Sequence, residues 1–392
     1  MPVPVPHPQQ ITVTIPGLGR LALSGPYRHR NLSLFYFHDT GRPLAEPNYI
    51  TLEEGTTSGQ VTVSEQADAR VGRLLISNMS DRPLFLQIGE IVKGGKQDRT
   101  LQASLVVPPR TRNFPVPSFC VERTRWAGGR KFAPRGVILP DRLGRLAVQK
   151  RSQAEVWSNV GSYKARANRN AAAVTGKALR RSRTSSVNEE LDNADFRKLI
   201  GTYESKLRPS CRRFSRPRGL VTVVDGQIST ADIYHASTLF RKLYPKLLKG
   251  SSAEAAAGRI STMWRGVTVH DVARFLAASW HGSKRTETYA HDNVFVRITS
   301  RRAVASQLFY KDNLIHVQVV RSGPVVIQPP PRPIPLPRPI PRPIPPRPEP
   351  RPLRRREPVD DSPPRGVLVP AEEGRRLHRQ QAVDNEKKGR SP

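Results

Sequence analysis

The stretch PLFLQIGEIVKGGKQDRTLQASLVVPPRTRNFPVPSFCVERTRW, residues 83–126, decides the fold of the first half of the chain. Short apolar runs rich in β-branched and aromatic residues alternate in it with clusters of glycine, proline and charge. Such runs lie at residues 84–88, 101–107 and 119–121. The alternation predicts consecutive strands joined by tight turns, and these turns carry most of the polar side chains of the stretch.

The first turn, residues 89–99, combines flexible glycine backbone with cations, carboxylates and an amide. The polar side chains that suggest a function are Glu90, Lys96, Gln97, Asp98 and Arg99. This composition suits a cradle for a phosphate or another oxyanion, although neither the GxxxxGK[ST] nor the GxGxxG spacing occurs. The simpler interpretation is a hairpin whose glycines supply positive φ and whose charges are solvated.

The runs GEIVKGGKQDR (89–99) and FPVPSFCVERTRW (114–126) resemble the pattern dGE.l.GaKQnR … ipVsCvE.gRW. That pattern is typical of the ARG and Rhodanese-Phosphatase-superfamily-associated protein domain family, a domain of unknown function. Flanking segments such as QAEVWSNV are similar too, so the resemblance covers about residues 11–321. Asp98 stands where the pattern has Asn, and Gly95 where it has Ala.

The family name records gene neighbourhoods shared with ADP-ribosylglycohydrolases. The resemblance therefore implies a link to ADP-ribose or another NAD-derived nucleotide, and it implies no particular reaction. A hydrolase of such a substrate needs cations for the pyrophosphate, and a carboxylate to activate water or stabilise an oxocarbenium-like centre.

These requirements select candidate residues from the two motifs. The candidates for catalysis are Glu90 and Glu122, and those for ligand binding are Lys96, Gln97, Arg99, Arg125 and Trp126. Lys96 and Arg99 suit the pyrophosphate, Gln97 a ribose or base edge, and Trp126 a nucleobase with Arg125 alongside. A core or rim position suits Trp126 equally well.

A second tier consists of Asp98, Asp232 and His316, of which the last two occupy places that resemble family motifs. Single histidines at such positions are usually structural. The only cysteines, Cys120 and Cys211, lie far apart, which excludes a disulfide framework. No Cys/His set has zinc-binding spacing, so the sequence assigns no metal and no cofactor. Cys120 is expected to be buried rather than nucleophilic, and the cysteine usage indicates a reduced, cytoplasmic protein.

The net charge of +33 and the pI of about 11.2 are extreme. Such a charge attracts phosphorylated ligands and also predicts non-specific binding to nucleic acid. No window approaches about 18 uninterrupted apolar residues, and the amino terminus has no basic-then-apolar leader, so neither membrane spanning nor standard secretion is expected.

The chain is expected to be an α+β protein with three parts. Residues 1–10 form a flexible start, and 11–322 form the family domain, divided into a β-rich half (11–150, a sheet or sandwich) and an α+β half (151–322). Of the 38 prolines, 20 lie at or after Pro324, so residues 323–392 are expected to be a disordered Pro/Arg-rich tail with extended polyproline character.

Local signals place further elements. Thr51 and Glu54 have capping-box spacing before a helix over 52–58, and Thr268 is expected to cap a helix over 269–281. A helix is also predicted over 188–207, a hairpin over 220–229 with Asp225-Gly226 as its turn, and closing strands over 294–299, 303–310 and 314–320. The basic run within 152–183 is expected to be a solvated or disordered face.

The leading functional hypothesis is a cytoplasmic enzyme or ligand-binding protein that handles ADP-ribose or another NAD-derived phosphorylated nucleotide. The alternative is a non-catalytic basic adaptor that recruits nucleic acid or protein partners through its cationic body and its Pro/Arg tail. A third hypothesis is a module that binds an ADP-ribosylated protein without cleaving it.

Overall fold

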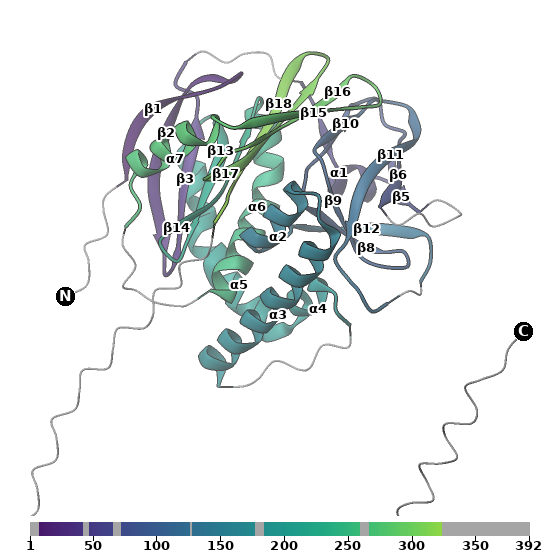
Figure 1. Cartoon of the computed structure of the whole chain (residues 1–392), viewed down its shortest axis with the longest axis horizontal. Helices are drawn as coiled ribbons and strands as arrows, with labels where there is room; N and C mark the ends of the chain where they lie inside the picture. Colours follow the sequence, from purple (N-terminus) through teal and green to yellow (C-terminus); the bar gives the residue numbers. More distant parts are fainter. Residues whose placement is uncertain are drawn as a thin grey trace, which may run out of the picture. The chain divides into compact units, whose positions relative to one another are not determined.

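The computed structural model describes residues 8–41, 47–65, 72–125, 128–176, 184–258 and 266–323. Trp126, residues 1–7 and the tail from residue 324 lie outside the described residues, so the predictions made for them stay predictions. Within the described parts, strands dominate the first half and all helices but one follow residue 141, which confirms the predicted α+β class (Figure 1).

A nine-stranded antiparallel sheet joins the beginning and the end of the domain. Its order is β1-β2-β3-β13-β14-β18-β17-β16-β15, so strands distant in sequence become neighbours where β3 pairs with β13. The strands are β1 (Gln9–Ile15), β2 (Gly19–His29), β3 (Leu32–His38), β13 (Pro217–Val224), β14 (Gln227–Tyr234), β15 (Ser283–Tyr289), β16 (Asn293–Thr299), β17 (Ala303–Tyr310) and β18 (Asn313–Arg321).

The two faces of this sheet belong to two hydrophobic cores. Leu34 and Tyr36 of β3 point into one core, whereas the alternate residues Phe35 and Phe37 point into the other. Helix α7 (Val269–Ser279) covers the second core, and the remaining helices and a small barrel share the first. Burial on both faces explains why central strands such as β3 and β13 are rich in apolar residues, whereas the edge strand β15 is polar and mostly exposed.

The family-like motifs lie in a closed six-stranded barrel of order β11-β6-β5-β12-β8-β9. Its strands are β5 (Val61–Ser64), β6 (Arg73–Asn78), β8 (Glu90–Gly94), β9 (Arg99–Leu101), β11 (Thr111–Cys120) and β12 (Lys131–Ile138). Beside it, β4 (Ile50–Thr51), β7 (Leu84–Leu86) and β10 (Leu105–Val107) form a three-stranded sheet of order β10-β7-β4. Gly95 starts the β8–β9 turn with φ +54, where a Cβ would collide with the ring of Phe132.

The other helices are α1 (Leu52–Thr57), α2 (Arg142–Gln149), α3 (Gln153–Thr175), α4 (Val187–Asp192), α5 (Ala194–Leu207), the 3₁₀ turn η1 (Arg208–Arg213) and α6 (Ser237–Ala257). Both predicted caps are confirmed, because Thr51 and Thr268 each form a capping box with the residue three positions on. The predicted hairpin is also confirmed, with positive φ at Asp225 and Gly226. No helix among the described residues is long and apolar enough to cross a bilayer.

Two local predictions were wrong, and a third was right only in part. The run 101–107 is not one strand, because β9 ends at Leu101 and β10 begins at Leu105 in a different sheet. The helix expected over 188–207 breaks at Asn193, whose side chain caps the start of α5. The basic run within 152–183 is not disordered as far as residue 175, because it belongs to helix α3, but its described basic side chains are partly or fully exposed, as a solvated face requires; residues 177–183 lie outside the described residues.

Candidate functional site

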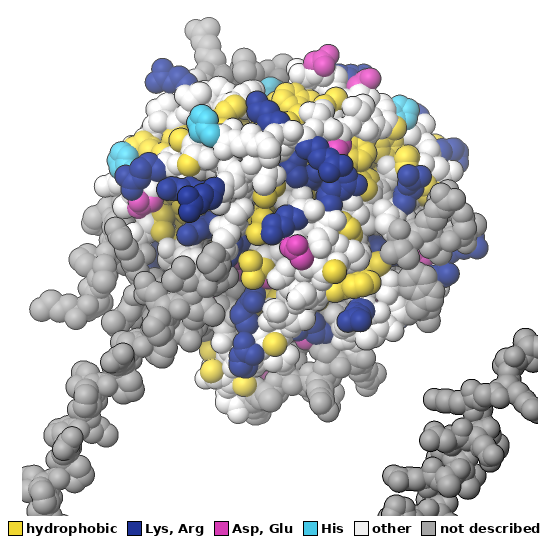
Figure 2. All heavy atoms as spheres, viewed as in Figure 1, with side chains coloured by type: hydrophobic (Ala, Val, Ile, Leu, Met, Phe, Trp, Pro, Cys, Tyr) yellow, Lys and Arg dark blue, Asp and Glu magenta, His cyan; other side chains and the backbone are white. Residues whose placement is uncertain are grey.

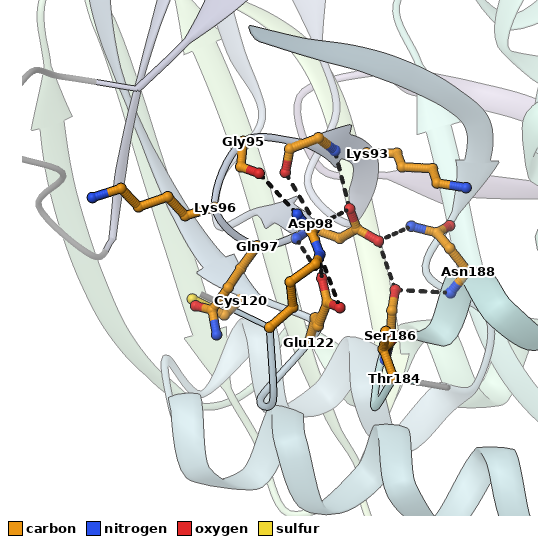
Figure 3. Close-up of polar contacts among 12 residues, drawn as sticks. Lys93, Gly95, Lys96, Gln97, Asp98, Cys120, Glu122, Thr184, Ser186 and Asn188 are labelled. Atoms are coloured by element: carbon orange, nitrogen blue, oxygen red, sulfur yellow. Dashed lines mark hydrogen bonds and ion pairs between the residues drawn. The ribbon is translucent and has the colours of Figure 1, made fainter. Parts of the chain in front are cut away.

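Asp98 is the centre of a buried polar network at the end of the β8–β9 turn (Figure 3). Its carboxylate is 3% exposed and accepts four hydrogen bonds. The Gly94 N–H and the Arg125 Nη2 donate to Oδ1, each at 3.0 Å. The Ser186 hydroxyl and the Asn188 amide donate to Oδ2 at 2.6 and 2.8 Å. The barrel turn is therefore tied to the start of α4.

Glu122 and Arg125 complete this network. The Arg125 Nε donates to both carboxylate oxygens of Glu122, at 3.1 and 2.9 Å, and its Nη1 donates to the Gly95 carbonyl at 2.9 Å. The Asp98 N–H donates to Glu122 at 3.2 Å. Partial burial disfavours the guanidinium charge, but Glu122 and Asp98 outweigh burial and raise the pKa of Arg125. Glu122 is 1% exposed, and both of its carboxylate oxygens accept hydrogen bonds from these donors. Its carboxylate therefore orients the loop.

Arg99 belongs to a second buried cluster next to this network, which it forms with Glu65 and Cys120. It is 1% exposed, forms an ion pair with Glu65 at 3.0 Å and donates to the Cys120 sulfur. Burial raises the pKa of Cys120, which keeps its thiol neutral as expected for a packed cysteine. A ligand phosphate reaches Arg99 only if the Glu65 pair opens.

Gln97 and Lys96 are two further motif residues, and neither is among the donors to the Asp98 carboxylate described above. The Gln97 amide donates to the Arg123 carbonyl at 3.4 Å, with only 4% of the residue exposed. Lys96 is half-buried, and Figure 3 shows its side chain directed away from Asp98. The position of Trp126 lies outside the described residues.

Glu90 belongs to a different buried cluster. Its carboxylate pairs with Lys246 of α6, which also pairs with Glu53 of α1. The Gln87 N–H donates to Glu90 at 2.9 Å. Burial raises the pKa of Glu90, although Lys246 opposes the shift. The two carboxylates proposed for catalysis, Glu90 and Glu122, therefore lie in separate ion-pair clusters.

The structure brings the second-tier residues Asp232 and His316 together with Ser104. Ser104 Oγ lies 2.9 Å from His316 Nδ1, and His316 Nε2 lies 3.3 Å from Asp232 Oδ1. Although this order of groups matches a hydrolytic triad, all three residues are at most 3% exposed. The Ser104 hydroxyl also accepts the Ile88 N–H, and the His316 ring stacks on Tyr234. The cluster cross-links the three-stranded sheet to the nine-stranded sheet.

A cavity of about 950 Å³ lies beside the Asp98 network, between the loop after β11 and helix α3. Its described lining is Arg123, Thr124, Ala154, Trp157, Ser158, Val160, Gly161, Lys164, Thr184 and Ser185. The Arg123 guanidinium lies over the Trp157 ring, 5.8 Å from its centroid. The Lys164 ammonium donates to the carbonyls of Thr184 and Ser186, at 2.7 and 3.0 Å, and so holds the far wall in place.

This lining suits one kind of ligand. It offers an exposed guanidinium, an indole face and several hydroxyls, which match a phosphate, a planar ring and a sugar. Among the described lining residues there is no carboxylate, imidazole or thiol to activate water or attack a bond. The described lining therefore offers groups that can bind an anion or a planar ring.

Sequence reasoning did not select Arg123 or Trp157. Both residues lie in segments that resemble the family pattern: Arg123 in the VERTRW run and Trp157 in QAEVWSNV. A tryptophan among polar residues is a usable signal, because such a side chain needs either a core or a ligand. The two residues meet only through the packing of α3 against β11, which the sequence pattern does not encode.

A family model described as ARG and Rhodanese-Phosphatase-superfamily-associated Protein domain matches residues 20–320. Neither the curated proteins nor the solved structures contain a match to the chain.

Proposed function

Because the chain belongs to the ARG and Rhodanese-Phosphatase-superfamily-associated Protein domain family, whose description names no reaction, we propose its function from the cavity beside the family-like motifs. The proposal is that the cavity binds ADP-ribose or another NAD-derived phosphorylated nucleotide. The observation that carries it is the Arg123–Trp157 pair at the cavity wall.

Each part of such a ligand has a counterpart in the described lining. Arg123 pairs with a phosphate, the Trp157 ring stacks on the base, and the hydroxyls of Thr124 and Ser158 bind ribose. These side chains support binding of the ligand without its turnover, since the two candidate catalytic carboxylates, Glu90 and Glu122, are each engaged in ion pairs. Both cysteines are unpaired and buried, and we place this function in the cytoplasm.

ADP-ribose is expected to raise the melting temperature of the full chain, by mass action on the folded state. At a hundredfold excess over Kd the gain is about 2.7 kcal/mol. Trp157→Ala should weaken binding about tenfold or more, because base stacking contributes about 1–3 kcal/mol. Trp157→Phe keeps an aromatic face and should retain most of the shift. Differential scanning fluorimetry with ADP-ribose, ADP and adenosine measures this, and no shift with any of them would contradict the proposal.

The basic adaptor is the second candidate, and the charge of the molecule favours it. Figure 2 shows many Lys and Arg side chains and few Asp and Glu side chains on the visible face. If the chain is an adaptor, removing residues 324–392 should abolish partner capture, and nucleic-acid binding should fall steeply with salt. A nucleotide-binding protein should keep its ADP-ribose shift after the same deletion. Filter binding over a salt series, with the thermal shift in parallel, separates the two.

A further inference from the structure

Two successive backbone N–H groups at the cavity wall converge on one oxygen atom. The N–H groups of Arg123 and Thr124 both donate to Ser185 Oγ, at 2.5 and 3.0 Å. The Thr124 hydroxyl lies 3.2 Å from the same oxygen. All three residues line the cavity of about 950 Å³.

We propose that these two N–H groups form an oxyanion subsite for the phosphoryl group of the ligand, and that the Ser185 hydroxyl closes it when no ligand is bound. This inference rests on the proposed function and assigns the part of the cavity that recognises phosphate. Ser185 then acts as a built-in competitor, which the ligand displaces.

The chemistry of the subsite favours an anion over a hydroxyl. Successive backbone N–H groups that point at one spot form a concave anion-binding nest. A phosphoryl oxygen accepts such bonds about twice as strongly as a neutral oxygen does. The Arg123 guanidinium belongs to the same residue as one of the two N–H groups, and Arg123 and Thr124 are exposed. A phosphoryl group therefore meets two N–H donors on a surface that solvent reaches, and the Arg123 guanidinium lies over Trp157 in the lining of the same cavity.

The segment that carries Ser185 is held in place by other residues. The Lys164 ammonium binds the carbonyls of both neighbours of Ser185, Thr184 and Ser186. The Ser186 hydroxyl is fixed to Asp98 at 2.6 Å. Rotation of the half-buried Ser185 side chain then loses only neutral hydrogen bonds and leaves this cavity wall anchored.

The buried charges of the motif hold the subsite in shape. Glu122 and Arg125 flank the two donor residues, and they are bound to each other and to Asp98. Since both ends of the loop are fixed, the N–H groups at 123 and 124 need no reorganisation to receive an anion. Asp98, Glu122 and Arg125 are thus positioning residues for the subsite.

Calorimetric titration of the full chain with ADP-ribose, inorganic pyrophosphate and adenosine tests the inference. Ser185→Ala opens the subsite and should bind ADP-ribose and pyrophosphate about fivefold more tightly, with adenosine unchanged. Ser185→Asp places a carboxylate in the subsite and should weaken both phosphate probes. Ser205→Ala is the control: it removes an exposed hydroxyl from α5, outside the cavity, and should change the affinity for neither phosphate probe.

Equal or weaker binding of both phosphate probes to Ser185→Ala would overturn the subsite, because a purely structural serine gives losses in both Ser185 variants. If no probe binds the wild type, the proposed function fails instead. In that case amide NMR of ¹⁵N-arginine-labelled Ser185→Ala decides the subsite alone. A shift of the Arg123 amide with pyrophosphate supports it, and no shift refutes it.

Discussion

Replacing Asp98 with alanine is expected to lower the free energy of unfolding by about 3–5 kcal/mol. The substitution removes the acceptor of four donors in a buried site, among them the Arg125 guanidinium. The loss is large because the Ser186 hydroxyl and the Asn188 amide lose a buried charged acceptor, while Arg125 keeps its pair with Glu122. Urea denaturation measures it as a lower midpoint with an unchanged slope.

A matched exposed pair provides the control for this prediction. Asp81 also pairs with an arginine, Arg110, but its side chain is 77% exposed. Asp81→Ala should therefore change the unfolding free energy by no more than about 1 kcal/mol. Asp98→Asn should cost less than Asp98→Ala, since an amide oxygen keeps part of the acceptor role. A loss below about 1 kcal/mol for Asp98→Ala would show that Asp98 does not organise the network.

Lys246→Met is expected to destabilise the protein by a similar amount, about 3–5 kcal/mol near neutral pH. The substitution leaves the Glu90 carboxylate, 2% exposed, without its cation. Burial already raises the pKa of Glu90 above 4.5, and loss of the ammonium raises it further. A carboxyl with a raised folded-state pKa stabilises the fold below its unfolded pKa, and this stability disappears as pH rises through the folded value.

The deficit of Lys246→Met relative to the wild type should therefore be small below about pH 4.5 and grow toward neutral pH. Unfolding titrations of both proteins across this range measure the difference. The double variant Glu90→Gln with Lys246→Met removes both charges and should recover much of the loss at neutral pH. A deficit that does not vary with pH would indicate that the cost comes from lost packing of the Lys246 side chain.

Local features of the fold were predictable from sequence because their causes are local. The capping boxes at Thr51 and Thr268 and the turn at Asp225-Gly226 each depend on residues within a few positions. The α+β class follows from the change from strand-like to helix-like periodicity along the chain. Such signals do not depend on which distant segment packs against them.

Long-range pairings were not predictable from one sequence. Glu90 meets Lys246 across 156 positions, and Ser104 meets His316 across 212. The motif residues were assigned to a ligand because polar clusters in glycine-rich turns resemble phosphate cradles. The structure instead gives Asp98, Glu122 and Arg99 buried partners that the sequence does not identify. The exposed Arg123, next to these residues, was passed over because a single arginine in a turn carries no distinctive pattern.

The cavity between the loop after β11 and helix α3 is the proposed ligand site. Calorimetric titration of ADP-ribose into the wild type, Arg123→Ala and Arg112→Ala tests this most directly. Arg112 is a matched control, an exposed arginine on β11 that does not line the cavity. We expect Arg123→Ala to bind at least about tenfold more weakly and Arg112→Ala to bind like the wild type. Equal affinity of all three proteins would contradict the account.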